Sequence, residues 1–199
     1  MTPRLNDMQL DALRELANIA SGTAATALGQ MLGQEVGLSV PVALALPLAD
    51  AVDACGTAES LVSGVVIPLE GDIEGLVLLL IPADHAAKLC ELLGVQAGSD
   101  VGDSALCEIG NILGTAYLNG LSAMTGMSLG PRPPHLTTDM LGAIVASLLA
   151  QTSGDSDAVL VLDSELDLQN DPCSITFLLL PSSGGVTGLL APLGLAEME

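Results

Sequence analysis

The sequence predicts an α+β fold in which long helices pack on an antiparallel sheet and one unit occurs twice about a pseudo-two-fold axis. A polar pattern of three residues recurs at a constant offset inside two long helical segments. A pair of strand-like apolar runs follows each helical segment, and the later runs end alike, in GLVLLLIP and ITFLLLP. A period near 100 residues indicates a duplicated domain-sized unit and not a solenoid of short repeats.

Each half is expected to contain a long helix, two strands and a short closing helix, with one additional helix inserted in the second half. The expected helices are 8–32, 89–94, 101–126, 139–151 and 189–194. The expected strands are 59–70, 75–82, 157–168 and 173–181. Helices combined with hairpin-like strand pairs are typical of helices laid on an antiparallel sheet. Because each half alone would bury little surface, we expect one domain, 1–199, made of two repeats at about 1–98 and 99–199.

The composition excludes several classes of function. The chain has 24 acidic residues against four Lys and Arg, which gives a formal charge of -20. Because phosphate contacts need a basic face, nucleic acids and anionic membranes are disfavoured as partners. No apolar run reaches the roughly 20 residues of a transmembrane helix, and no signal peptide is visible, so we expect a cytoplasmic protein. The acidity itself indicates either solubility for an apolar chain or a salt-adapted host.

The cysteines and histidines form no recognisable ligand pattern. The four cysteines are Cys55, Cys90, Cys107 and Cys173. They include no Cys-x-x-Cys, so we expect buried free thiols rather than a zinc site or a disulfide framework. His85 and His135 are far apart in the sequence. We therefore expect the chain to hold no metal and no cofactor of its own.

The polar pattern reads Asp or Ser, three residues, Glu, two residues, Asn. The first motif is Asp11, Glu15 and Asn18, and the second motif, 93 positions later throughout, is Ser104, Glu108 and Asn111. At about 100° per residue, the members of each motif fall within about 60° on one helix face, opposite the large apolar residues. Gly22 and Thr115 continue these two polar faces. The motifs therefore predict two outward-facing surfaces on which a partner can lie.

The chemistry of the motifs favours a site that a partner completes. An Asn amide both accepts and donates hydrogen bonds, which suits it to orienting a water molecule for phosphoryl transfer. A Glu one turn earlier would repel a phosphoryl group but could pair with a cationic side chain beside it. No nucleophile with an activating base is visible, because Ser104 has no His near it in the sequence. The alternatives are a solvated helix face, or a duplicated pattern with one inactive copy.

The segments around both motifs resemble a known family. EIGNILGTAYLNGLSAMTGM at 108–127 and ELANIASGTAATALGQML at 15–32 are similar to the signature of the CheC/CheX/FliY family, phosphatases of the phosphorylated chemotaxis response regulator CheY. The resemblance extends over the whole chain and implies a CheC-like fold. Two motif copies favour a CheC-like protein over the single-site CheX type. No flagellar-switch domain is visible after the second repeat and no regulator-binding peptide before the first helix, so we expect a stand-alone CheC-like protein rather than a FliY-like switch component. The first copy departs from the signature at Ala17 and Thr23, where Gly and Asn are common.

The resemblance implies a role for each motif position. Asn18 and Asn111 would orient the water that attacks the aspartyl phosphate, and Glu15 and Glu108 would pair with the active-site lysine of the response regulator. The residues expected to contact the partner are Asp11, Ser104, Gly22 and Thr115. The phosphorylated CheY-like regulator would carry the Mg²⁺, and a CheD-like receptor deamidase is a second candidate partner. The alternatives are a binding module that sequesters a receiver domain or a CheD-like deamidase without hydrolysis, and a structural member of a flagellar assembly.

Overall fold

A computed structural model of the chain describes residues 7–39, 42–46, 50, 53, 55–151, 159–168, 172–182, 188 and 191. The helices are α1 (Asp7–Leu32), α3 (Ala83–Leu92), α4 (Asp100–Thr125) and α5 (Leu141–Gln151). The strands are β1 (Gly37–Leu38), β2 (Val42–Leu46), β3 (Leu61–Gly71), β4 (Gly75–Pro82), β5 (Leu129–Pro131), β6 (His135–Met140), β7 (Val159–Asp167) and β8 (Pro172–Pro181). None of the described helices is both long enough and apolar enough to cross a membrane.

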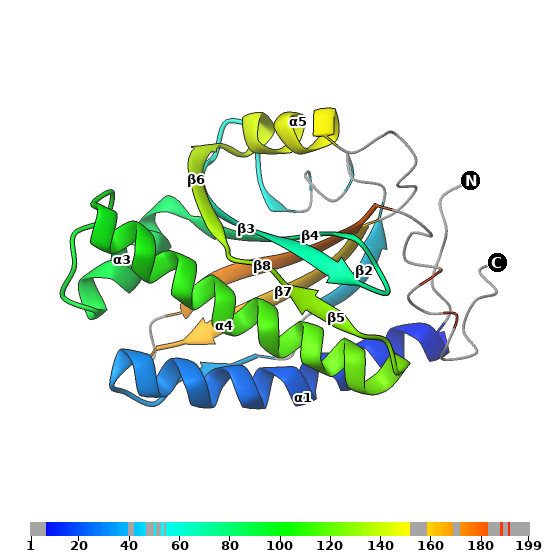
Figure 1. Cartoon of the computed structure of the whole chain (residues 1–199). Helices are drawn as coiled ribbons and strands as arrows, with labels where there is room; N and C mark the ends of the chain where they lie inside the picture. The colour runs from blue at the N-terminus through cyan, green and yellow to red at the C-terminus, as the bar shows by residue number, and fades with distance from the viewer. Residues whose placement is uncertain are drawn as a thin grey trace.

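One eight-stranded antiparallel sheet joins the two halves of the chain (Figure 1). The strand order is β1-β7-β8-β4-β3-β5, and β2 and β6 pair with β7 and β3. At the centre, β4 of the first half pairs with β8 of the second, with Leu79 opposite Phe177. The ring of Phe177 lies 4.9 Å, centroid to centroid, from that of Tyr117 in α4. These are the only Phe and the only Tyr of the chain, and both are buried.

The strand registers repeat about a pseudo-two-fold axis through this central pair. Gly37 of β1 pairs with Asp167 of β7, and Gly130 of β5 pairs with Glu70 of β3. The glycines are 93 positions apart, from 37 to 130, and their acidic partners 97, from 70 to 167. The same displacements relate the β2–β7 pairs to the β6–β3 pairs. The predicted α+β fold with a pseudo-two-fold duplicated unit is therefore confirmed, while the repeat limits at 1–98 and 99–199 stay a prediction.

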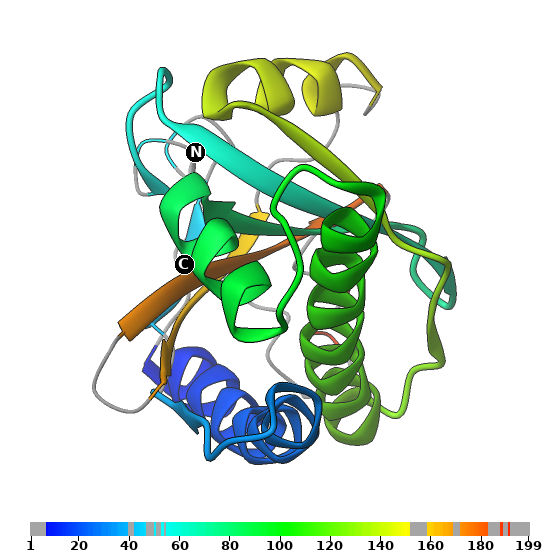
Figure 2. The same ribbon diagram turned by 90° about the vertical axis from the view of Figure 1, so that its left-hand side faces the viewer.

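Helices cover both faces of the sheet. The helices α1 and α4 lie on one face together with α3, and α5 lies on the other (Figures 1 and 2). Alternate residues of β4 serve the two cores. Val77, Leu79 and Ile81 pack in the larger core with α1 and α4, whereas Leu78 and Leu80 pack in the smaller core with α5. Strands buried on both faces need continuous apolar runs, which explains the sequence GLVLLLIP.

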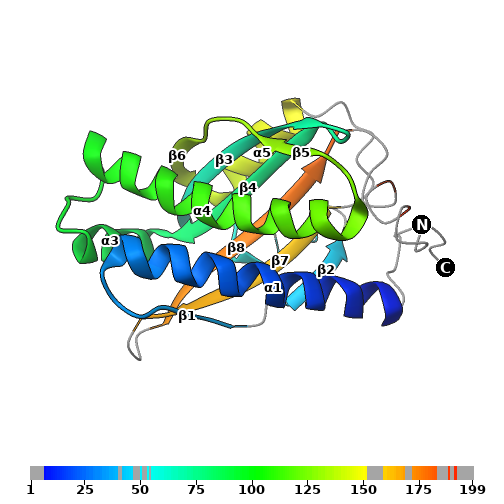
Figure 3. The same cartoon turned by 60° about the horizontal axis from the view of Figure 1, so that its bottom comes forward.

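Local signals set the limits of α4. The Ser99 hydroxyl accepts a hydrogen bond of 3.1 Å from the backbone N–H of Gly102, which caps the helix at its N-terminus. Gly126 ends the helix in the left-handed conformation, with φ of 72°, which glycine adopts without a steric penalty. The helices α1 and α4 run antiparallel across the sheet (Figure 3). Each helix therefore begins where the other ends.

The sequence predicts the long elements better than the short ones. The helices at 8–32 and 101–126 and all four predicted strands are confirmed to within a few residues. The short helix expected at 89–94 is α3, which already begins at Ala83, and α5 begins at Leu141 because 135–140 form β6. The strands β1, β2, β5 and β6 were missed, because they are short edge strands and β6 reads HLTTDM, without apolar alternation. The helix expected at 189–194 lies outside the described residues except for 191.

The cysteine prediction holds in part. All four cysteines are thiols that form no disulfide. Cys90 and Cys173 are buried, whereas Cys55 and Cys107 are half-buried. The imidazole of His85 accepts a hydrogen bond of 3.0 Å at Nδ1 from the backbone N–H of Ser174. His85 therefore links α3 to β8 and has a structural role.

The first prediction concerns Gly110, which lets α4 approach β3 closely. A Cβ added there would lie 2.6 Å from a γ-carbon of Val65, whose branched side chain is stiff. Overpacking costs about 1–3 kcal/mol, and the helix propensity of Ala returns about 1 kcal/mol. We expect Gly110→Ala to lower the free energy of unfolding by up to about 2 kcal/mol in denaturant titrations.

Gly22 of α1 is the matched control, because a Cβ there would meet no atom within 4 Å. Gly22→Ala should stabilise the protein by up to about 1 kcal/mol. Equal effects of the two substitutions would contradict the role of close packing between α4 and β3.

Candidate functional site

The structure places both motifs on outward faces of α1 and α4, as the helical periodicity predicts. The exposed members are Asp11, Glu15, Asn18, Ser104 and Glu108, and Asn111 is half-buried. Each motif begins in the N-terminal half of its own helix, and the helices are antiparallel (Figure 3). The structure therefore brings the three members of each motif together but keeps the two motifs toward opposite ends of the helix pair. They form two separate surfaces.

The first motif contains an ion pair that the sequence analysis did not anticipate. Arg14 Nη1 lies 3.0 Å from Asp11 Oδ1, and both side chains are exposed. An exposed pair of this kind contributes at most about 1 kcal/mol, but it places a cation next to the carboxylate of Asp11. Within the described part of the chain, the side chains of Glu15 and Asn18 form no hydrogen bond or ion pair. Both are therefore available to a partner.

The second motif is held more firmly by its own helix. The Ser104 hydroxyl donates a hydrogen bond of 2.8 Å to the backbone carbonyl of Asp100, one turn earlier. The Thr115 hydroxyl lies 3.5 Å from Asn111 Oδ1, to which it donates a long hydrogen bond. Position 115 corresponds to Gly22 in the first motif, which has no side chain to offer. The amide of Asn111 thus has a local partner that the amide of Asn18 lacks.

A groove of about 250 Å³ between α1 and α4 adjoins the second motif. Asn111, Ile112, Thr115 and Asn119 line it from α4, and Thr23 and Ala27 are among the residues that line it from α1. Asn111 is half-buried because it forms part of this wall, whereas Asn18 lies outside the groove and is exposed. The two motifs therefore share a chemistry but differ in their surroundings.

The charges around the motifs also differ. Position 107, which corresponds to Arg14, is a cysteine, so the second motif has no basic residue beside its Glu. Asp100 and Asp103 lie in the first turn of the same helix. Burial, followed by the negative charge of Asp103, raises the pKa of the Cys107 thiol above its ordinary value, so this thiol is neutral at pH 7. The second motif therefore presents the more negative surface.

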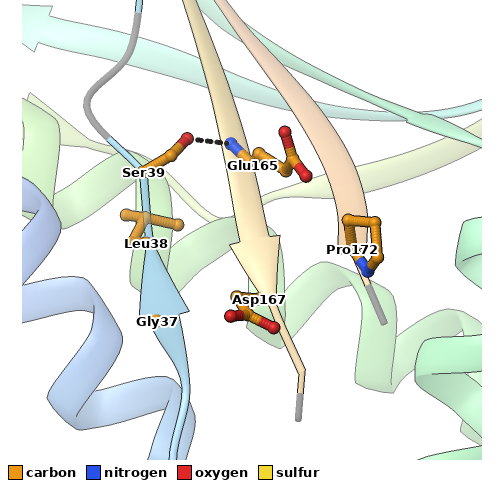
Figure 4. A pocket seen from close by; sticks show the side chains of 6 residues that line it. All are labelled: Gly37, Leu38, Ser39, Glu165, Asp167 and Pro172. Carbon is orange, nitrogen blue, oxygen red and sulfur yellow. Dashed lines mark hydrogen bonds between the residues drawn. The ribbon is translucent and has the colours of Figure 1, made fainter. Parts of the chain in front are cut away.

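Two further cavities lie apart from the motifs. One of about 560 Å³ is bordered by β1, β7 and β8, where the backbone N–H of Glu165 donates a hydrogen bond of 3.1 Å to the Ser39 hydroxyl (Figure 4). Glu165 and Asp167 line it with Pro172. Another of about 370 Å³ lies between α3, α4 and the β3–β6 edge, and it includes Asp103. Among the residues that the structure describes, no group of three or more His, Cys, Asp or Glu is placed to hold a metal ion.

The second prediction uses the thiol of Cys107 as a probe of charge at the second motif. Thiols react with iodoacetamide as thiolates. Because the pKa of Cys107 is raised, its alkylation should need a higher pH in the folded protein than in the unfolded chain. We expect Asp103→Asn to lower the pKa of Cys107 and to speed its alkylation at pH 8 by a few fold, because one of the two causes is removed. Mass spectrometry of the alkylated peptide measures the rate. Asp84→Asn, on α3, is the control. If Asp103→Asn leaves the pH dependence of Cys107 alkylation unchanged, burial alone raises the pKa of the thiol.

Comparisons with known proteins agree with the fold and with the family that the sequence resembles. Residues 8–44, which contain the first motif and all of α1 except Asp7, match the CheC-like family. The chain is 32% identical over 170 residues to the CheY-P phosphatase CheC of Bacillus subtilis, covering 81% of each chain. It is 25% identical to the CheC1 protein of Halobacterium salinarum, over 83% of this chain and 86% of that protein.

Solved structures show the same fold. FliY of Thermotoga maritima superposes with a TM-score of 0.75 at 20% identity, over 97% of this chain and 99% of that one. A structure of the FliM–SpeE complex from H. pylori superposes with a TM-score of 0.71 at 15% identity, over 96% of this chain and 97% of that one. Sequence identity, coverage and fold together place the chain: it belongs to the CheC-like family.

Proposed function

We propose that this protein is a phosphatase that hydrolyses the phospho-aspartate of a CheY-like response regulator in chemotaxis signalling, in the cytoplasm. The observation that carries the proposal is the repetition of an exposed, locally unpartnered Glu three residues before an Asn, on two equivalent helices. The relative from Bacillus subtilis, 32% identical over 81% of this chain, is named a CheY-P phosphatase. The two motifs would be its two reaction surfaces.

In this proposal each Asn holds the attacking water and each Glu anchors the partner. Glu15 and Glu108 pair with the active-site lysine of the receiver domain. Asn18 and Asn111 lie about 4.5 Å further along the helix axis, which sets the water beside that lysine. Water attacks phosphorus, and the bond between phosphorus and the aspartyl oxygen breaks. Inorganic phosphate leaves with both protons of the water, and the aspartate of the regulator remains as a free carboxylate. Placement and charge supply most of the catalysis in such reactions.

The regulator would supply the positive charges that the reaction needs, namely Mg²⁺ and the lysine. This assignment agrees with the motifs, which contain only Asp, Ser, Glu and Asn side chains. Asp11, Ser104, Gly22 and Thr115 would contact the receiver beside the reacting groups. The formal charge of -20 attracts the cationic side of a receiver over a distance. Binding without hydrolysis, of a receiver domain or of a CheD-like deamidase, is the alternative that the Asn variants below separate.

The third prediction concerns the two asparagines. We expect Asn18→Ala/Asn111→Ala to slow the protein-dependent loss of phosphorylated receiver by about 10²-fold or more, because the water loses its placement. Of the single variants, Asn111→Ala should have the larger effect, because Asn111 has the Thr115 contact and the groove. Decay of ³²P-labelled receiver measures the rates.

Gln30→Ala is the control for this experiment, since Gln30 is an exposed amide of α1 that belongs to neither motif. A double variant that hydrolyses as fast as the wild type would refute the role of the asparagines. Equal decay with and without wild-type protein would leave binding as the function.

The fourth prediction concerns the two glutamates. We expect Glu15→Lys/Glu108→Lys to weaken association with the phosphorylated receiver at least about tenfold, because charge reversal replaces attraction to a lysine by repulsion. The loss should shrink as salt is raised. Glu59→Lys/Glu74→Lys, at exposed acids on either side of β3, changes the net charge equally and should cost much less. Calorimetric titration measures the affinity of both double variants for the receiver. Equal losses of affinity would show that only the net charge of the protein matters.

A further inference from the structure

Exposed apolar side chains flank both motifs at the same two positions relative to the Glu. One lies seven residues before it and the other four residues after it. The first apolar row is Met8 and Ile19, and the second apolar row is Val101 and Ile112. Met8, Ile19 and Val101 are 70%, 57% and 63% exposed, and Ile112 is half-buried. The rows therefore repeat with the same offset of 93 positions as the motifs.

Helical geometry places each row on one side of its Glu. Taking the Glu as zero, the apolar residues lie at about +20° and +40° around the helix axis. The first and last members of the motif lie at about -40° and -60°. Each Glu thus separates a polar side, which carries the Asn, from an apolar side. Single exposed apolar residues are normal on protein surfaces. Their repetition at matched positions beside a motif is not explained by chance exposure alone.

Both rows lie on the inner side of the helix pair. Ile112 lines the groove between α1 and α4, together with Thr23 of the opposite helix. On α1, the groove-lining residues Thr23 and Ala27 lie at about +80° and +120° from Glu15, on the same side as Met8 and Ile19. A partner that contacts either Glu can therefore cover the adjoining row while it rests against the seam between the helices.

We infer that the two apolar rows are docking surfaces for the receiver domain, whose apolar side chains they contact on both sides of the lysine that pairs with Glu15 or Glu108. This inference rests on the proposed function. The rise of 1.5 Å per residue puts the apolar contacts about 10 Å before and about 6 Å beyond the Glu. The lysine's own methylene stem adds apolar surface to the same contact.

Charge decides between the receiver and a second copy of this chain as the occupant. Two copies docked through these rows would bring the glutamates of both into one interface in a chain that already carries a formal charge of -20. Like charges in an interface cost several kcal/mol. A receiver that presents a lysine instead gains an ion pair, and the apolar rows add contacts that do not depend on charge. An apolar contact beside a charged anchor is also the usual composition of a specific interface.

The test measures affinity in a background that cannot turn over phosphate. In Asn18→Ala/Asn111→Ala protein, the triple change Met8→Ser, Ile19→Ser and Val101→Ser removes the exposed side chains and leaves the half-buried Ile112 in place. The probe is Bacillus subtilis CheY carrying Mg²⁺ and beryllofluoride, which takes the place of the phosphoryl group. We expect the triple change to weaken binding at least about tenfold with an unchanged dependence on salt. The glutamate reversals, by contrast, change the salt dependence.

The matched control is Leu61→Ser/Met140→Ser. These residues are 55% and 52% exposed and are paired across β3 and β6, beside the start of α5. The two substitutions remove exposed apolar surface that lies away from α1 and α4, so they should leave the affinity for the receiver unchanged. Sedimentation of the wild-type protein and the triple variant tests for self-association.

Wild-type affinity in the triple variant would overturn the docking role, and so would an affinity loss as large in the control. Loss of a self-associated form without loss of receiver binding would assign the rows to a second copy of the chain. The outcome is separate from that of the catalytic proposal. If the Asn variants retain full hydrolysis while the triple change weakens binding, the asparagine role fails and the docking surface stands.

Discussion

The antiparallel pairing of β4 with β8 is the interaction on which the rest of the structure depends. It joins the two halves in one sheet, with Leu79 and Phe177 facing each other at the pseudo-two-fold axis. Because equivalent strands meet there, the equivalent helices α1 and α4 must lie on the same face of the sheet and run in opposite directions. The only two aromatic rings of the chain, Tyr117 and Phe177, fill the core at this point. The position of both motifs follows from this one strand pair.

Much of this architecture could be predicted from the sequence, and the exceptions have physical reasons. The runs around Leu79 and Leu178 are continuously apolar because both sides of the sheet are covered, so they read plainly as strands. The outward direction of Glu15 and Glu108 follows from helical periodicity alone. The edge strand 135–140 could not be predicted, because its residues are polar and its pairing partner β3 is remote in sequence. Local patterns do not encode such partners.

Sequence periodicity also could not predict the differences between the two surfaces, because these differences depend on neighbours in space. Asn18 and Asn111 occupy equivalent helical positions, but the half-burial of Asn111 depends on the neighbouring helix. The ion pair between Arg14 and Asp11 and the contact between Thr115 and Asn111 involve residues that differ between the two copies of the repeated pattern. The structure thus combines one architecture, used twice, with two local environments. The fold neighbours FliY and FliM show that this architecture is shared by proteins of very different sequence.

Fusion of the two halves into one chain has a consequence for how the surfaces can change. In a symmetric dimer of identical subunits, every substitution appears at both surfaces at once. Here the residues at positions 14 and 107 are encoded separately, and one is an arginine while the other is a cysteine. Under the proposed function, each surface can therefore acquire its own affinity and rate while the shared sheet keeps both in place. A single gene thereby encodes two surfaces that can change independently on one shared sheet.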